Sequence, residues 1–362
     1  MPPMRAPRLA PALLCVLAAG ALVGGCGGGS GGGESTSTSG ETAASRPAPP
    51  KSAFPSPEGR SLREVLKAAD ARAEVLVEPA AVVFYPGENR YPFEIVDKDH
   101  QPISDAEVAL YYAKVPQPKP GAKSKSGNRG QIAKAESQAL DEPAVGPFPA
   151  QLESLATKPQ FRAESTLEDP DAPGVVYSTE LTFPGDGEWR LAAILKEDGE
   201  LKGALLPGVV VGEFKRVPKP GQKAPVISTP TAQDAGGELS KITTRKPPDS
   251  QNQVDYADAL GKEPIVLLFA TPQFCQSRVC GPVVDVAEQA KSEYGDKAAF
   301  IHMEIYNEND PGYGVRPQVR AFHLPSEPWL FTIDRRGVVR EAVEGAFGLK
   351  LMHKAVDKAI AP

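Results

Sequence analysis

The chain has 362 residues, with 40 Lys and Arg against 46 Asp and Glu, and a net charge of −6. The two signs of charge are mixed along the sequence, so it offers no basic surface of the kind that binds nucleic acid. The length that is left after an N-terminal leader is enough for two domains.

The first 25 residues predict an export signal. Arg5 and Arg8 form a short basic region, and the apolar stretch 9–23 is too short to predict a membrane span. The stretch ends in Leu-Val-Gly-Gly before Cys26, which resembles the lipobox of bacterial lipoproteins. The resemblance implies that Cys26 becomes the lipidated first residue of the mature protein, on the outer face of the cell membrane. Secretion with a chance cysteine at this position is the alternative.

The sequence that follows predicts a tether and then a short helix. Residues 26–60 are of low complexity, and their glycine-rich start favours a flexible tether. Residues 61–72 predict a helix, in which Ser61 and Glu64 have the spacing of a capping box.

Residues 61–214 predict a β-sandwich domain of Ig-like type. About seven short runs rich in Val, Tyr and Phe are separated by Pro, Gly and Asp, without helices between them. The sequence from about 115 to 174 predicts a partly disordered insertion, because its first half has no apolar periodicity. The strand pattern of 89–112 and 175–195, with its Gly-x-Trp ending, resembles FixH/YtkA-like accessory domains.

Residues 215–362 predict an α/β domain with helices on both faces of its sheet. Strands are expected at five runs, and the run 264–270 is continuously apolar, as in a strand buried on both faces. The expected strands are 223–228, 264–270, 298–306, 328–334 and 337–345. The expected helices are 254–264, 281–294, 316–324 and 349–361.

Two cysteines, Cys275 and Cys280, lie between the apolar run and the helix that follows it. A helix N-terminus stabilises a thiolate, which is the reactive form of cysteine. Cys15 leaves with the leader and Cys26 takes lipid, so the remaining pair is expected to bond to itself. Five residues of regular helix rise about 7.5 Å, whereas a disulfide needs Cα atoms within about 7 Å. Either Cys275 precedes the first turn, or the turn unwinds on oxidation.

Three motifs resemble the thioredoxin/redoxin superfamily: Gly-Gln-Lys-Ala-Pro at 221–225, the run 269–275 followed by Gly-Pro at 281–282, and Ser-Glu-Pro-Trp-Leu at 326–330. The resemblance covers about 218–362 and implies a thioredoxin-like fold. It implies that Cys275 is the attacking thiolate and Cys280 the resolving thiol. It also implies that Pro328 is a cis-proline that shapes the substrate groove.

The cysteine spacing departs from that of most thioredoxins, which have two intervening residues where this chain has four. The buried acid that many thioredoxins carry on the preceding strand is missing, because Leu267 and Leu268 fill that region. A spacing of four resembles one branch of the peroxiredoxins, in which a Thr and an Arg orient the peroxide. Thr271 would supply the hydroxyl, and Arg278 or Arg320 the cation.

The predicted function is a membrane-anchored, extracytoplasmic thiol–disulfide oxidoreductase that uses Cys275 and Cys280. Its partners would be protein or small-molecule thiols and disulfides. Three alternatives stay open: a thiol peroxidase, a non-catalytic binding module with a structural disulfide, and a Sco-like copper chaperone in which His323 joins the thiolates. No cofactor, metal site or nucleic-acid partner is expected, and nothing specifies the partner of the β domain.

Overall fold

The computed structural model describes residues 44–117, 128–169, 172–275 and 277–362. The predicted signal peptide and Cys26 lie outside the described residues, as does the first part of the predicted insertion, 118–127. Residues 42–362 form one compact unit. Among the described residues, no helix combines the length and the apolar character that a membrane crossing requires.

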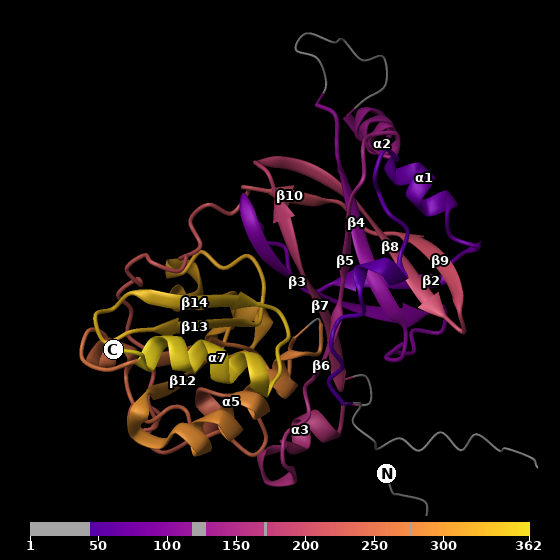
Figure 1. Ribbon diagram of the computed structural model, residues 1–362. Helices are drawn as coiled ribbons and strands as arrows, with labels where there is room; N and C mark the ends of the chain where they lie inside the picture. Colours follow the sequence, from indigo (N-terminus) through magenta and orange to yellow (C-terminus); the bar gives the residue numbers. More distant parts are fainter. Residues whose placement is uncertain (1–43, 118–127, 170–171, 276) are drawn as a thin grey trace, which may run out of the picture. The chain divides into compact units, whose positions relative to one another are not determined.

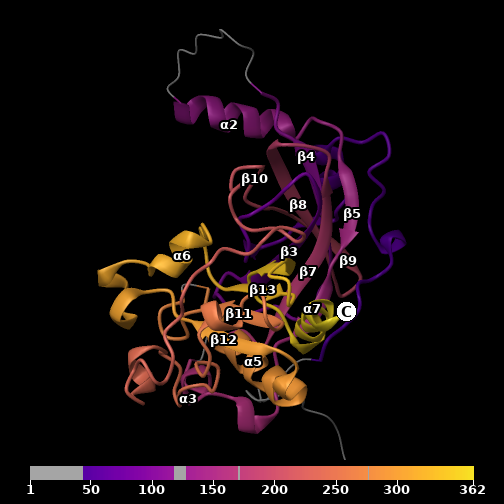
Figure 2. The same ribbon diagram turned by 90° about the vertical axis from the view of Figure 1, so that its left-hand side faces the viewer.

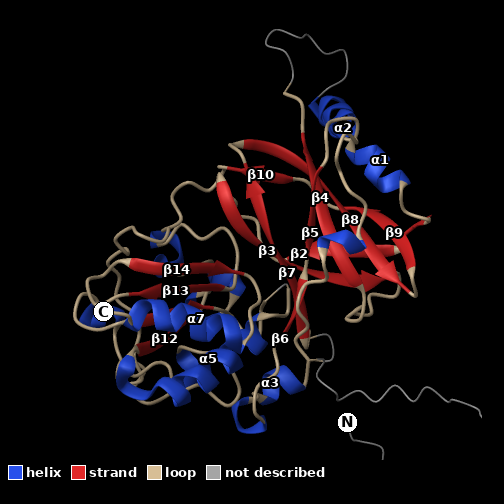
Figure 3. Ribbon diagram, viewed as in Figure 1, coloured by secondary structure: helices blue, strands red, loops and turns tan. Residues whose placement is uncertain are grey.

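The N-terminal half is β-rich and contains two sheets (Figures 1 and 3). One sheet has the order β1 (Ala71–Arg72), β9 (Glu200–Leu205), β8 (Gly187–Glu197), β4 (Glu107–Lys114) and β5 (Val145–Pro149), with β10 (Val209–Val211) also paired to β8. The other has the order β2 (Val75–Pro79), β3 (Gly87–Asp97), β7 (Val175–Phe183) and β6 (Gln151–Ser154). Both sheets contribute to one apolar core, in which Tyr112 lies against Phe183 and Trp189. The Ig-like assignment of this region stays a prediction.

The predicted tether is wrong from Arg46 onward. Arg46 pairs with Leu152 of β6, and its guanidinium donates to the carbonyl oxygens of Asp105 and Ala106. Phe54 is 6% exposed and packs against α1 (Leu62–Lys67) and β4. Because burial of an aromatic ring offsets the loss of chain entropy, this stretch is fixed on the β-rich region. The capping box predicted for α1 is present.

The predicted insertion is also more ordered than expected. Beyond α2 (Asn128–Ala139) it supplies β5 to one sheet and β6 to the other, followed by a 3₁₀ turn (Pro159–Phe161) and α3 (Glu164–Leu167). Phe148 of β5 stacks on Tyr112, with ring centroids 5.5 Å apart. The two prolines of β5 hide the strand in the sequence, and they are tolerated because β5 is an edge strand.

The C-terminal half holds a four-stranded mixed sheet of order β12 (Ala299–Met303), β11 (Ile265–Phe269), β13 (Trp329–Ile333) and β14 (Val339–Glu344). β11 runs parallel to β12 and antiparallel to β13, and every residue of β11 is buried, as its apolar run predicted. The helices α5 (Cys280–Tyr294) and α7 (Leu349–Ile360) cover one face, and α4 (Tyr256–Ala259) and α6 (Pro317–Ala321) the other. Helices on both faces were expected.

The strand expected at 223–228 is not formed. Lys223 makes only an isolated bridge to Val338, and Pro225 has no N–H to continue a ladder. The sheet therefore has four strands where the sequence predicted five.

The β-rich region meets the C-terminal sheet at a close contact that we call the β14 junction, formed by residues 80–83 and 344–346. The carboxylate of Glu344 accepts hydrogen bonds from the backbone N–H groups of Val82 and Val83, both at 2.9 Å. Gly345 lies so close to Ala80 that an added Cβ would stand 2.2 Å from its carbonyl oxygen. The junction is thus built largely from backbone groups.

Candidate active site

Cys275 and Cys280 form a disulfide, with their Cα atoms 5.9 Å apart. Cys280 is the first residue of α5, and Cys275 lies in the loop between β11 and this helix. Of the two arrangements that the spacing allowed, the structure therefore has Cys275 before the first turn. The loop reverses direction with the help of Arg278, whose φ of 56° is in the left-handed region.

The two sulfur-bearing residues differ in access. Cys280 is completely buried, whereas Cys275 is partly exposed. The Oγ of Ser277 lies 3.4 Å from the Sγ of Cys275, and in the disulfide only the hydroxyl has a proton to donate. Of the two sulfur-bearing side chains, only that of Cys275 can be reached from solvent. Sequence reasoning did not single out Ser277.

Pro328 lies beside the start of the cysteine loop. Its peptide bond with Glu327 is cis, as the resemblance implied. Trp329 pairs with Phe269 in the antiparallel ladder between β13 and β11, which brings Pro328 next to Ala270, where β11 leads into the loop. The carbonyl oxygen of Pro328 accepts a hydrogen bond from Gly345 at 2.9 Å, so the junction residues also hold the proline loop.

Thr271 and Arg278 are not assembled as the peroxide-binding pair that one alternative required. Thr271 is fully buried, and its hydroxyl makes no hydrogen bond to any described residue. Arg278 is exposed and turns to Asp169, with 2.7 Å between Nη1 and Oδ1. Arg320 lies on α6 and donates to the carbonyl oxygen of Val315.

The β-rich region supplies one wall of the disulfide, the segment Leu155–Asp169, which we call the α3 wall. Figures 1 and 2 both show α3 beside α5. Leu155 and Val279 share a small buried cluster, and Cys275 packs against it. A Cβ on Gly281 would meet the Oγ1 of Thr166 at 2.9 Å. The first turn of α5 is therefore covered by residues distant in the sequence.

A buried ion pair fixes the α3 wall to the middle of α5. Arg245 and Asp285 are 5% and 2% exposed, and Nε lies 3.0 Å from Oδ1. The same carboxylate accepts from the backbone N–H of Ala163 at 3.1 Å, and Arg245 donates to the carbonyl oxygen of Phe161 at 2.7 Å. Burial raises the pKa of Asp285, and Arg245 opposes that shift by favouring the charged form.

A second buried pair lies under the cysteine loop, on β12. The Nδ1 of His302 is 2.8 Å from the Oδ2 of Asp249, and its Nε2 is 3.2 Å from the carbonyl oxygen of Ala270. Both ring nitrogens therefore lie beside oxygen atoms that can accept hydrogen bonds. Burial alone would raise the pKa of Asp249, but His302 outweighs it and lowers that pKa to about 2. Burial alone would lower the pKa of His302, but Asp249 outweighs it and raises that pKa.

Glu304 is a buried carboxylate that the sequence reading missed. It is 1% exposed and accepts from both the backbone N–H and the hydroxyl of Thr244, and this hydroxyl accepts from Gln273 of the cysteine loop at 3.1 Å. The sequence signal was a charged residue at the end of the apolar run 298–306.

Comparisons with solved structures find partial matches, two of which are described below. No protein-family model matches the chain, and no curated protein sequence matches it. A structure assigned as thiol:disulfide interchange protein DsbE from Chlorobium tepidum is 18% identical, covers 40% of this chain and 99% of its own, and has a TM-score of 0.27. A thioredoxin-like superfamily protein is 15% identical, covers 38% of this chain and 97% of its own, and also has a TM-score of 0.27.

The C-terminal half is a thioredoxin-like domain. The helices on both faces, the disulfide at the start of α5 and the cis-proline before β13 agree with the expectation drawn from the sequence, whereas the sheet has four strands in place of five.

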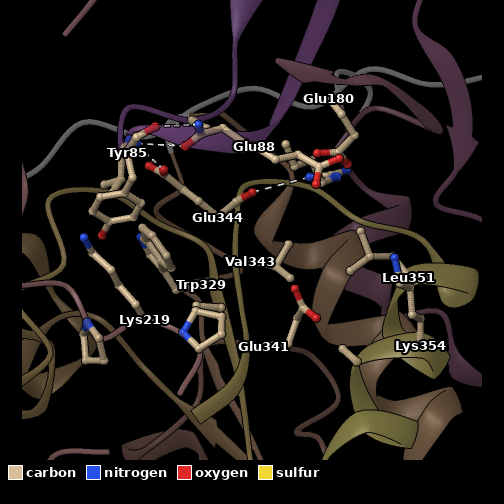
Figure 4. Close-up of a pocket in the computed structure, with 18 of the residues that line it drawn as sticks. Tyr85, Glu88, Glu180, Lys219, Trp329, Glu341, Val343, Glu344, Leu351 and Lys354 are labelled. Carbon is tan, nitrogen blue, oxygen red and sulfur yellow. Dashed lines mark hydrogen bonds between the residues drawn. The ribbon is translucent and has the colours of Figure 1, made fainter. Parts of the chain in front are cut away.

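A cavity of about 460 Å³ lies between the β-rich region and the thioredoxin-like domain (Figure 4). Its floor includes Trp329 and Val343, and acidic and basic side chains surround it. Lys219 lies over the ring of Tyr85, 3.6 Å from the centroid. Neither cysteine lines this cavity, so it is distinct from the disulfide, although Trp329 directly follows the cis-proline.

The described residues contain no group of three or more His, Cys, Asp or Glu side chains placed to hold a metal ion. His323, the candidate third ligand for copper, is exposed and lines a surface depression with residues 212–217. The described residues therefore do not bring His323 together with the two cysteines as a copper site would require.

Proposed function

We propose that the protein is a thiol–disulfide oxidoreductase whose redox centre is the Cys275–Cys280 disulfide. The observation that carries the proposal is that the two cysteines at the start of α5 differ in their exposure to solvent. One is partly exposed and can be attacked, and the other is buried at a helix N-terminus, where a departing thiolate is stabilised.

The proposed reaction is a two-electron exchange. A substrate thiolate attacks the Sγ of Cys275, a new S–S bond forms, and the bond to Cys280 breaks, leaving the Cys280 thiolate, which takes a proton. A second substrate thiol then attacks the substrate sulfur of the mixed disulfide, and Cys275 leaves as a thiolate, which takes a proton. The substrate leaves as a disulfide, and both cysteines are reduced. The reverse sequence reduces a substrate disulfide, and the reduction potential sets the direction. Pro328 would border the substrate, and Ser277 would donate to the Cys275 thiolate.

We also propose that the protein acts outside the cytoplasm as a lipoprotein. This rests on the sequence pattern before Cys26 and on the use of a disulfide, which persists in oxidising compartments. Membrane fractions should contain a mature chain that begins at Cys26 and carries lipid mass. Cys26→Ser should move the protein out of the membrane fraction. A membrane-bound Cys26→Ser protein without lipid would contradict the anchor.

The β-rich region is proposed to be an Ig-like sandwich that forms part of the surroundings of the redox centre. Support comes from the common core of its two sheets and from the α3 wall that it places against the disulfide. Its own partner stays unassigned.

The deciding experiment is a redox titration of the full chain with Cys15 and Cys26 replaced by Ser. Glutathione and dithiothreitol buffers would set the potential, and alkylated thiols would be counted by mass. We expect a reversible two-thiol step between roughly −270 and −120 mV. A disulfide that resists reduction below about −300 mV would be structural and would overturn the proposal.

A non-catalytic binding module is the second candidate, and the cavity in Figure 4 favours it. It combines an apolar floor with polar groups, as ligand sites do. The same titration separates the binding module from the oxidoreductase. A disulfide that resists reduction fits a binding module, whereas a reversible two-thiol step fits the oxidoreductase. A thiol peroxidase is less favoured, since Thr271 is buried and Arg278 pairs with Asp169.

A further inference from the structure

We propose that the α3 wall is the specificity element of the redox centre, and that it admits small thiols or cysteines on extended chains while hindering cysteines on folded surfaces. The proposal rests on the proposed exchange function and names the substrate class of the same site. It assigns a role to residues that lie more than a hundred positions before the cysteines.

The geometry leaves one of the two cysteines open to attack. Cys280 is fully buried, so a thiol must attack Cys275. On one side the Cys275 side chain packs against the cluster of Leu155, Val176 and Val279. The carboxylate of Asp169 reaches Arg278, which belongs to the loop that the disulfide closes. An attacking sulfur must lie in line with the S–S bond, so groups standing beside that line limit the size of the attacking molecule.

Three kinds of contact, of different strength, hold the α3 wall on the thioredoxin-like domain. Its inner part is fixed by two hydrogen bonds from backbone N–H groups to side chains of α5, that of Ala163 to Asp285 at 3.1 Å and that of Lys158 to Gln289 at 2.8 Å. Its middle is the apolar contact of Leu155. Its outer end is the Arg278–Asp169 pair, whose side chains are 48% and 28% exposed. Because exposed pairs contribute little, the outer end is the part that can yield to a substrate.

The test compares two reductants on one protein. The full chain with Cys15 and Cys26 replaced by Ser would be mixed with dithiothreitol or with reduced thioredoxin, a folded protein dithiol. The second-order rate of reduction of Cys275–Cys280 would be followed by acid quench, alkylation and mass. Each dithiol supplies both electrons and is itself oxidised to a disulfide, so the reaction balances with either probe.

Asp169→Asn should weaken the outer end of the wall. We expect its rate with thioredoxin to rise about fivefold, the factor that the small energy of an exposed ion pair allows. The rate with dithiothreitol should change by less than about twofold. Leu155→Ala removes the apolar part of the wall and should raise the thioredoxin rate further, with the same selectivity.

The matched control is Asp141→Asn, which breaks another exposed Arg–Asp pair, between Asp141 and Arg63 of α1. It should change neither rate. Circular dichroism would establish that each variant is folded. Equal changes with both reductants, or no change in either variant, would overturn the role of the wall while leaving the exchange function intact. Failure of both reductants on the unmodified protein would instead refute the proposed function.

Discussion

Two of the contacts between the β-rich region and the thioredoxin-like domain are built differently. At the β14 junction, backbone meets backbone, and a buried carboxylate accepts two main-chain N–H groups. At the inner end of the α3 wall, the side chains of the buried Arg245–Asp285 pair bind the backbone of Phe161 and Ala163. At its outer end, the contact is the exposed side-chain pair of Arg278 and Asp169. A contact made of backbone tolerates little change, whereas a graded side-chain contact can loosen at one end. The adjustable contact is the one beside the disulfide.

The strongest test of this difference is Gly345→Ala at the junction. Gly345 has a φ of 78°, and its added Cβ would stand 2.2 Å from the carbonyl oxygen of Ala80. We expect the free energy of unfolding to fall by about 2–6 kcal/mol, because backbone strain and overpacking each cost about 1–3 kcal/mol. Urea unfolding would measure it. The control is Gly59→Ala, which has a similar φ of 67° but no atom within 4 Å, and which should show the strain alone. Equal losses in both variants would mean that the junction is not tightly packed.

Arg245→Met tests the inner end of the α3 wall. It leaves the Asp285 carboxylate buried without its cation, so the free energy of unfolding should fall by about 3–5 kcal/mol. The double variant Arg245→Met with Asp285→Leu removes both charges and should recover part of the loss. If Arg245→Met unfolds at the same urea concentration as the unmodified protein, the buried pair does not hold the wall.

Glu344→Gln tests the junction through pH. Burial raises the pKa of Glu344, and its hydrogen bonds only partly oppose the shift. A raised folded pKa means that the native state binds the proton more tightly, so the Glu344 contribution to stability is largest below about pH 4.5 and declines as pH rises through the folded pKa. Gln does not titrate. The unmodified protein should therefore lose stability relative to Glu344→Gln between pH 4.5 and neutrality, as seen by urea unfolding at several pH values. Parallel pH curves for the two proteins would contradict this.

Asp169→Asn should have the smallest effect on stability. The pair with Arg278 is exposed, so we expect a loss of less than about 1 kcal/mol, reduced further by added salt. The same variant is expected to change the rate with a folded reductant. A large loss of stability together with unchanged rates would make the outer end of the wall a structural support.

The elements of the thioredoxin-like domain could be predicted because their signals are local. β11 and the strand after Pro328 can each be predicted from their own apolar residues, without knowledge of distant ones. The strand expected at 223–228 failed because Pro225 and the lack of a continuous partner limit it to one bridge. In the β-rich region the prolines of β5 concealed a strand whose place is set by pairing with β4.

The site was predictable only in part for the same reason. The cysteines and Pro328 could be found from their spacing and from the resemblance, and Pro328 is cis as expected. The α3 wall has no periodic pattern, and only tertiary packing brings Leu155 to Val279. His302 lies in β12 and Glu304 directly after it, within an apolar run of the sequence where a charge suggests an exposed edge. Their partners Asp249 and Thr244 come from a loop with no regular structure, so sequence alone could not pair them.

The edge strand β5 limits how copies of this protein could pair with one another. Pro149 stands opposite Ala109 in β4, and it is Ala150 that donates to Val108, so the ring nitrogen of Pro149 faces away from the sheet. An open edge invites another chain to extend the sheet, and a proline there removes one of the donors such pairing needs. If a lipid at Cys26 crowds many copies together, this strand keeps neighbouring molecules from joining sheet to sheet.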